Sequence, residues 1–348
     1  HSLRRRQRQM CIRDSSYRDL GITLKKKIKQ LSGIEVKVLD GAKIQDHDYK
    51  RYNIIALGNM LDNPVIFRLY REHYTFVDGR YPGVNGYVLR TVHDPFGYGR
   101  NVVVIGGSNY EGVKVALRNL MNKLSIRNSG ITLDPIIDTV SNFNVPFDPT
   151  PEFREEIFER IEFELDEGND QRAFCPALAT GIYYYQTGDI RWSSIFKECF
   201  YRYFDRVWHA KRSPMGMAEF WAWILILVWD LVEESPVFTD TERLEITNTL
   251  YNLIEHATEM SYIKALKPDH IRWNHETFNA LTLLYGANYF LKYYHLKEAR
   301  RWLSIAEKCF KSQARASRSW DEASGYSALT PRHTMNYALL AGDLEYFK

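Results

Sequence analysis

One run of polar residues has the types and the spacing that proton-transfer chemistry needs. The sequence RWNHE occupies residues 272–276, after a loop and at the predicted start of a helix. The Asn274 amide can donate a hydrogen bond to a developing anion, and the His275 imidazole titrates near neutral pH. Residues 277–291 carry no charged side chain, which predicts a helix that is buried on all sides. We therefore expect Asn274 and His275 at the accessible end of an internal helix.

A small or polar stripe continues along this predicted helix. His275, Asn279, Thr282 and Gly286 fall at i, i+4, i+7 and i+11, so they share one helical face. A single histidine in such a setting is also compatible with a structural role. The neighbouring asparagine, arginine and tryptophan favour a functional one.

A second polar cluster follows about fifty residues later in the chain. The sequence WDEASGY at residues 320–326 combines two acids, a Ser-Gly turn and Tyr326, and Arg332 and His333 follow before an apolar stretch. Alone, this segment fits an ordinary helix-capping loop as well as it fits part of a site.

Together, the two clusters resemble a known enzyme family. Asn274-His275 at a helix start, followed by an acidic, small-residue segment that ends in Gly-Tyr at Tyr326, is similar to the α/α-toroid polysaccharide lyases of the heparinase II/III-like and alginate lyase group. The resemblance covers roughly residues 150–348. It implies an (α/α) toroid, in which the helix that starts at Asn274 belongs to the inner ring and opens onto a central cavity.

The resemblance also implies a reaction, the β-elimination of uronic-acid chains. Asn274 matches the residue that neutralises the uronate carboxylate, which is needed because removal of the C5 proton builds an enolate-like dianion. His275 and Tyr326 match the base and the acid, and the residues alone leave open which of them takes which role.

Further residues of the two clusters are predicted to bind the substrate. Arginine and histidine would hold uronate carboxylates, tryptophan would stack on sugar faces, and Glu276 would lie within the same site. These predicted substrate-binding residues are Arg272, Trp273, Glu276, Trp320, Arg332 and His333.

Two other functions remain open from the sequence. A glycoside hydrolase on an (α/α) toroid would need two carboxylates about 5–10 Å apart, and Asp321 or Glu322 could form such a pair with Glu276. A non-catalytic carbohydrate-binding helical domain would not need Asn274, His275 and Tyr326 to converge.

The chain divides into segments of different character, which predicts an α+β multidomain protein. Residues 1–15 show no periodicity and contain a string that resembles translated sequencing adapter, so we expect a non-native or disordered segment. Residues 16–140 predict a small α/β domain with apolar strands near 52–58, 86–92 and 101–106. Asn63 and Pro64 predict a helix start, and Ser108 is the expected cap of a second helix.

From residue 141 onward the pattern changes. The proline-rich stretch 141–151 predicts a linker, and residues 152–348 show only helical patterns, which predicts the toroid catalytic domain. The predicted helices are fewer than a complete toroid needs, so we expect a chain that is truncated at its C-terminus. The expected helices span residues 152–164, 171–187, 191–209, 216–234, 240–259, 274–295, 298–315 and 331–347.

Neither a cofactor nor a metal is predicted. The turn at residues 105–108 follows a strand but lacks the spacing of a phosphate-binding loop, so a tight strand-to-helix turn is expected. Cys175, Cys199 and Cys309 lie far apart without a CxxC spacing, which predicts buried free thiols.

Charge and hydropathy exclude two classes of partner. The formal net charge is +3, but residues 1–15 hold five arginines and one aspartate, and the rest has 41 basic and 42 acidic side chains. Nucleic acid is therefore not an expected partner. The longest apolar run, residues 220–232, is shorter than the ~20 residues of a membrane span. The expected partner is an acidic polysaccharide, and a lyase of this group would be secreted or periplasmic.

Overall fold

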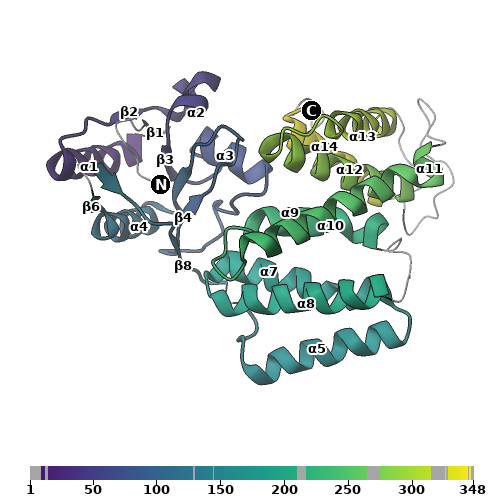
Figure 1. Cartoon of the computed structure of the whole chain (residues 1–348). Coiled ribbons are helices and arrows are strands. Elements are labelled where there is room, and N and C mark those ends of the chain that lie inside the picture. The colour runs from purple at the N-terminus through teal and green to yellow at the C-terminus, as the bar shows by residue number, and fades with distance from the viewer. Residues whose placement is uncertain are drawn as a thin grey trace. The chain divides into compact units, whose positions relative to one another are not determined.

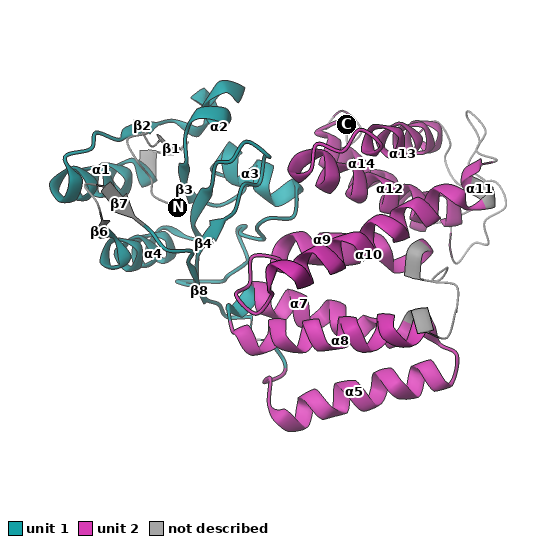
Figure 2. Ribbon diagram, in the orientation of Figure 1, with its two compact units in different colours: residues 1–146, 186–188 teal, residues 147–185, 189–348 magenta. Residues whose placement is uncertain are grey.

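The computed structural model separates into two compact units, which are considered one at a time (Figures 1 and 2). Unit 1 contains residues 1–146 and 186–188, and unit 2 contains residues 147–185 and 189–348. The structure describes residues 9–11, 15–127, 130–143, 145–209, 217–264, 274–314, 326, 328–343 and 345. Over these residues the protein is mainly helical with one larger sheet, which gives the α+β composition that the sequence predicts.

A six-stranded sheet forms the centre of unit 1, in the order β2-β1-β3-β5-β4-β8. The strands β1, β2, β3 and β5 are parallel, and β4 and β8 run antiparallel to their neighbours. The strands of this sheet are β1 (Gln9–Cys11), β2 (Lys37–Leu39), β3 (Ile54–Gly58), β4 (Tyr87–Val92), β5 (Val102–Gly107) and β8 (Ile137–Val140). A separate two-stranded ribbon joins β6 (Ser125–Arg127) and β7 (Gly130–Thr132).

Two strands are not among those that the sequence predicts. Gln9–Cys11, within the segment expected to be non-native or disordered, forms β1 and pairs with both β2 and β3. Ile137–Val140, at the border of the expected linker, pairs with β4 as the edge strand β8. Strands this short depend on the backbone hydrogen bonds of a partner strand, and their own sequence carries too little periodicity to reveal them.

Helices cover this sheet because its strands alternate their side chains between two faces. Ile55 and Leu57 of β3 and Ile105 of β5 pack with α1 and α4 into one continuous apolar core. The helices of unit 1 are α1 (Ser15–Ser32), α2 (Asp46–Arg51), α3 (Pro64–Arg71) and α4 (Tyr110–Lys123).

Two helices of unit 1, α3 and α4, start at asparagine caps. As predicted, the Asn63 side chain accepts from the Val65 amide and Pro64 opens α3. The cap of α4 is Asn109, whose side chain accepts from the Gly112 amide, and not Ser108 as expected. Asn109 has the extended backbone that an N-cap requires, so it takes the role one residue later.

Unit 2 is built from helices only, over its described residues. Their positions match the predicted helices closely, with a break before Cys175-Pro176 and an earlier end at Gly342, where a backbone φ of +71° stops the last helix. They are α5 (Pro151–Asp166), α6 (Asp170–Ala173), α7 (Cys175–Thr187), α8 (Ile190–His209), the π-helical turn Met217–Trp221, α9 (Ala222–Val232), α10 (Asp240–Glu259), α11 (Ser261–Lys264), α12 (Asn274–Tyr293), α13 (Ala299–Gln313) and α14 (Leu329–Ala341).

Three helices of unit 2, α5, α8 and α10, form a series (Figure 1), and their contacts show that they run in the same direction. Arg154 and Arg206 form ion pairs between α5 and α8 with Glu198 and Glu162, respectively. Both contacts advance in the same sense along the two helices, so the helices are parallel.

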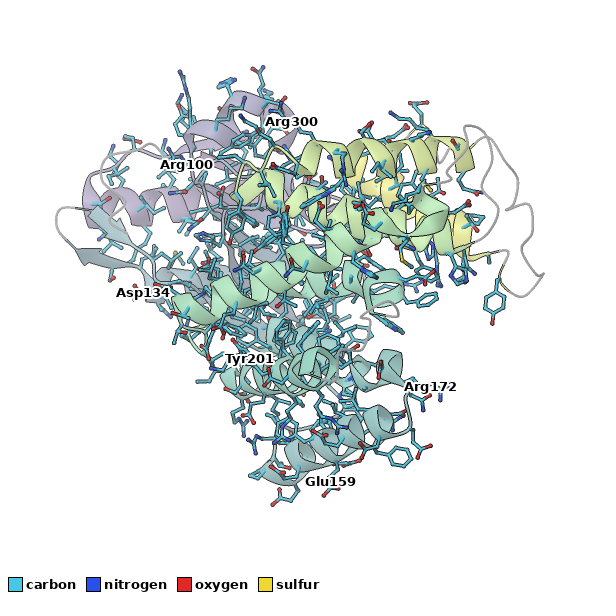
Figure 3. All side chains as sticks on the ribbon, turned by 45° about the vertical axis from the view of Figure 1, so that its right-hand side comes forward. Arg100, Asp134, Glu159, Arg172, Tyr201 and Arg300 are labelled. Carbon is cyan, nitrogen blue, oxygen red and sulfur yellow. The ribbon has the colours of Figure 1, made fainter. Side chains whose placement is uncertain are left out.

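The same direction continues from α8 to α10. Lys197 donates to Glu242 at 2.9 Å, and one turn later Tyr201, labelled in Figure 3, donates to Glu245 at 2.8 Å. The helices α5, α8 and α10 are parallel, so the chain must return between each of them and the next. The elements between them therefore include a second set of helices that runs in the opposite direction.

That second set includes α9 and α12, which are also parallel to each other. Trp229 donates to the Tyr289 hydroxyl at 3.0 Å, and Lys292 donates to Asp230 at 3.0 Å, near the C-terminal ends of both helices. The contact between Glu219 and His275 lies at their N-terminal ends.

The core of unit 2 is strongly aromatic. Each large ring that is buried in it contributes roughly 2–3 kcal/mol through the apolar surface it removes from water. The most completely buried large side chains of this unit are Trp192, Trp229, Trp302, Tyr203, Tyr289, Phe174, Phe196, Phe200 and Phe310.

The helix α12 is buried along nearly its whole length, as its lack of charge predicts. Its Gly286 faces α10 so closely that an added Cβ would lie 2.4 Å from Ile254 Cδ1. The small residue at this position therefore permits close helix packing and does not line a cavity. No helix among the described residues has the length and apolar character to cross a membrane.

Candidate functional site

The first turn of α12 carries the predicted Asn-His pair, and the two side chains differ in exposure. Asn274 is 6% exposed, whereas the His275 side chain is 41% exposed. The turn is held by the Thr277 hydroxyl, which donates to the Asn274 carbonyl, and by the Asn279 amide, which donates to the His275 carbonyl at 2.8 Å. The imidazole is thus accessible on a backbone that is fixed on both sides.

A buried carboxylate pairs with this histidine. Glu219, which is 5% exposed, forms a hydrogen bond through Oε1 to His275 Nδ1. Glu219 lies in the π-helical turn Met217–Trp221 that precedes α9, and such turns re-aim side chains out of the regular helical pattern. Burial of a carboxylate is costly unless a strong partner compensates, and the imidazole provides that partner.

Aromatic rings lie against the Glu219–His275 pair. The Phe220 ring meets the His275 ring edge-to-face at 5.4 Å between centroids, and it meets Phe278 at 5.1 Å. Phe278 in turn lies 4.3 Å from the His333 ring of α14. The Glu219–His275 pair therefore borders an apolar wall, which lowers the local dielectric and strengthens its hydrogen bond.

The position of His333 corrects its predicted role. Its side chain is 2% exposed, and its Nδ1 lies 2.9 Å from the Thr277 hydroxyl. Burial, with a smaller contribution from the nearby Arg332 charge, lowers the pKa of His333 to about 4. A neutral, buried imidazole does not supply the cation that was expected to hold a uronate carboxylate. Arg332 itself is exposed at the start of α14.

Glu276 also lies in the interior, although it was predicted to contact substrate. It is 4% exposed, and its backbone carbonyl accepts from Cys309 Sγ at 3.7 Å. Burial raises the pKa of the Cys309 thiol well above its usual value, and the Glu276 charge adds to that effect. Its place one residue after His275 turns it toward α13 rather than toward the exposed imidazole.

The remaining predicted site residues are placed only in part. Tyr326 is 57% exposed, and its backbone carbonyl accepts from the Leu329 amide at 2.9 Å. Its convergence with Asn274 and His275 stays a prediction. Arg272, Trp273 and Trp320, and the acids Asp321 and Glu322 of the hydrolase alternative, lie outside the described residues.

Glu219 is the functional candidate that the sequence did not single out. It directly precedes the apolar run 220–232, so an acid at the border of a buried helix was the available signal. Its partner lies 56 positions later, and only the parallel packing of α9 and α12 brings the two together.

A second polar cluster closes the opposite ends of the same two helices. Tyr293 and Lys292 both donate to Asp230, at 2.7 and 3.0 Å, and Tyr289 donates to Glu233 at 2.6 Å. Burial and the neighbouring Asp230 charge raise the pKa of Glu233 to about 8. These groups satisfy one another inside the protein.

The turn before α4 and two of the three cysteines have the structure that the sequence predicts. An added Cβ at Gly106 or Gly107 would meet Val77 or the Val113 backbone within 3 Å, so the turn before α4 is tightly filled. Cys199 and Cys309 are buried free thiols, and Cys175 is partly buried. Within the described ranges, no group of three or more His, Cys, Asp and Glu side chains is arranged to hold a metal ion.

Comparisons with models of protein families, with curated proteins and with solved structures gave no match.

Proposed function

We propose that this chain belongs to a polysaccharide lyase that cleaves uronic-acid-containing chains by β-elimination. The observation that carries the proposal is the accessible His275 imidazole, held by the buried Glu219 carboxylate and adjacent to Asn274 at the start of a buried helix. A proton-transfer group must be oriented and reachable at once, and His275 combines both properties.

The chemistry of the reaction assigns a task to each of three residues. Asn274 neutralises the uronate carboxylate by donating hydrogen bonds that strengthen as negative charge develops. His275 and Tyr326 carry the proton transfers at C5 and at the glycosidic oxygen. Tyr326 is 57% exposed, which suits a residue that must meet a substrate.

The arrangement of unit 2 is compatible with an (α/α) toroid. In a toroid, inner helices run parallel to one another and outer helices form a second parallel set. The pair α9–α12 and the series α5–α8–α10 have this relation. The proposal takes α9 and α12 as inner helices, with their N-terminal ends at the substrate side. Acidic polysaccharides of this kind lie outside the cytoplasm, so the proposed location is the periplasm or the exterior.

The position of Glu276 beside α13 weakens the glycoside hydrolase alternative. That alternative needs Glu276 as one of two carboxylates that flank the substrate, whereas Glu276 lies next to the buried Cys309 of α13. The accessible group at this end is an imidazole, which suits proton abstraction at carbon better than glycosidic hydrolysis.

The experiment that tests the proposal supplies the protein with sulfated and unsulfated uronic-acid polymers. Elimination leaves a C4–C5 double bond that absorbs in the near ultraviolet, whereas hydrolysis produces new reducing ends without that absorbance. We expect equal numbers of absorbing ends and new reducing ends. Asn274→Ala and Tyr326→Phe should each lower kcat by about 10²-fold or more with little change in KM. New reducing ends without absorbance would identify a hydrolase and contradict the proposal.

A further inference from the structure

We infer that Glu219 is the positioning residue that makes His275 the proton acceptor, acting through Nε2, and leaves the acid role to Tyr326. This inference rests on the proposed function and resolves the division of roles that the sequence left open. It starts from the hydrogen bond between Glu219 Oε1 and His275 Nδ1.

The pairing fixes which ring nitrogen carries the hydrogen in neutral His275. An ionised carboxylate has only acceptor atoms, so the hydrogen bond requires a hydrogen on Nδ1. The neutral imidazole then has its lone pair on Nε2. A histidine without this partner would populate both tautomers, and the Nε2–H form cannot accept a proton at Nε2.

The ring is also held in place while it stays accessible. Nδ1 points toward the buried Glu219, whereas the side chain as a whole remains 41% exposed. The Phe220 ring abuts the imidazole at 5.4 Å and restricts its rotation about χ2. The geometry thus combines a fixed ring with an accessible side chain.

These assignments account for each proton and each electron pair of the reaction. The C5 proton moves to His275 Nε2, and the electron pair of the C5–H bond becomes the C4–C5 double bond. The bond between C4 and the glycosidic oxygen breaks, and that oxygen takes a proton from the Tyr326 hydroxyl. The resulting imidazolium is stabilised by the Glu219 carboxylate, and exchange of protons with water restores both groups.

A kinetic test uses Glu219→Leu, which removes the carboxylate and keeps an apolar side chain of similar length at a buried position. We expect kcat to fall by about 10²-fold while KM changes little, because only the transition state loses a correctly placed base. Glu219→Asp retains a carboxylate and should recover part of the rate. Glu245→Leu on α10 is the matched control, since Glu245 pairs with Tyr201 away from α12, and it should retain wild-type kcat.

A spectroscopic test is independent of any substrate. In the ¹⁵N-labelled protein, the nitrogen shifts of neutral His275 should show hydrogen on Nδ1 in the wild type and a mixture of tautomers in Glu219→Leu. A wild-type His275 with its hydrogen on Nε2 would overturn the inference, as would unchanged kcat in a folded Glu219→Leu on a polymer that the wild type cleaves. If the wild type yields no unsaturated product but shows the Nδ1–H tautomer, the proposed function fails and the positioning role stands.

Discussion

The two ends of the α9–α12 pair use similar residues for different purposes. At the N-terminal end, one carboxylate, Glu219, meets one imidazole, that of His275, and this side chain remains well exposed. At the C-terminal end, Asp230 meets both Lys292 and Tyr293, and these partners are largely enclosed. The helices are the same, but the imidazole at one end is 41% exposed, whereas the Lys292 and Asp230 side chains at the other end are 15% and 13% exposed.

This difference shows how a buried acid can be structural or functional. An acid whose partners are all internal contributes to stability and to the alignment of the helices, because removal of a partner leaves a desolvated charge. An acid whose partner has a second, accessible nitrogen can transmit its charge to a substrate. We therefore expect changes at the N-terminal end to affect rate, and changes at the C-terminal end to affect the free energy of unfolding.

The largest expected effect is on the rate, at the N-terminal end. His275→Ala should lower kcat by about 10²–10⁴-fold, because the proposed base is lost. Tyr293→Phe, at the other end, removes a hydroxyl that binds Asp230 and should leave kcat near the wild-type value. Steady-state kinetics on a cleaved uronic-acid polymer measures both. Equal losses in the two variants would mean that the ends do not differ in function.

The next effect is on stability, at the C-terminal end. Lys292→Met keeps the aliphatic stem but removes the charge that faces Asp230, whose side chain is 13% exposed. The free energy of unfolding should fall by about 3 kcal/mol, because the remaining carboxylate is poorly solvated. Urea unfolding at neutral pH measures this loss. A loss below about 0.5 kcal/mol would place this ion pair with ordinary surface pairs.

A smaller effect is expected on the free energy of unfolding at acid pH, and it comes from His333. Its pKa is lowered to about 4 in the folded protein, so between pH 6.5 and pH 4 the unfolded chain binds the extra proton. Stability from this group is present above that range and decreases as the pH falls through it, by about 2 kcal/mol between pH 7 and pH 5.

The variant His333→Phe isolates this contribution. It should be less sensitive to acid than the wild type between pH 7 and pH 5, although it loses the contact to Thr277. His73 of unit 1, whose pKa is also lowered to about 4 by burial, stays in both proteins and cancels in the difference. Identical acid dependence in the two proteins would show that His333 does not resist protonation.

The smallest expected effect concerns Glu233. Its pKa is raised to about 8, so the folded protein binds the extra proton between pH 4.5 and pH 8 and loses stability as the pH rises through that range. Glu233→Gln imitates the protonated acid. It should match the wild type at pH 5 and exceed it by about 1 kcal/mol at pH 9, because the glutamine does not acquire the buried charge. Melting curves at the two pH values test this, and a variant that is less stable at pH 9 would contradict it.

The sequence predicts most helices because each carries its own local signals. The run before α10 supplies a capping box, in which Thr239 and Glu242 bind each other's backbone amides, as the residue types indicate. The lack of charge in residues 277–291 likewise predicts the burial of α12. Such signals are local, so they can be recognised without knowledge of the tertiary structure.

The pairing at the candidate site depends on tertiary contacts, which the sequence does not specify. Asn274 and His275 could be selected from their neighbours, but nothing near Glu219 indicates which imidazole it meets. His333 and Glu276 were expected to face substrate because of their residue types, yet the packing of α12 against α13 and α14 turns both inward. The short strand β1 shows the same limit, since its partners β2 and β3 come later in the chain.

The proposed function requires that His275, at the accessible end of α12, removes the proton from C5 of the uronate. The most direct measurement compares the cleavage rates of a uronic-acid oligosaccharide with hydrogen and with deuterium at C5. The account predicts a lower kcat/KM for the deuterated substrate, because the C5–H bond breaks before the sugar chain does. Equal rates for the two substrates, with new reducing ends that lack ultraviolet absorbance, would contradict it.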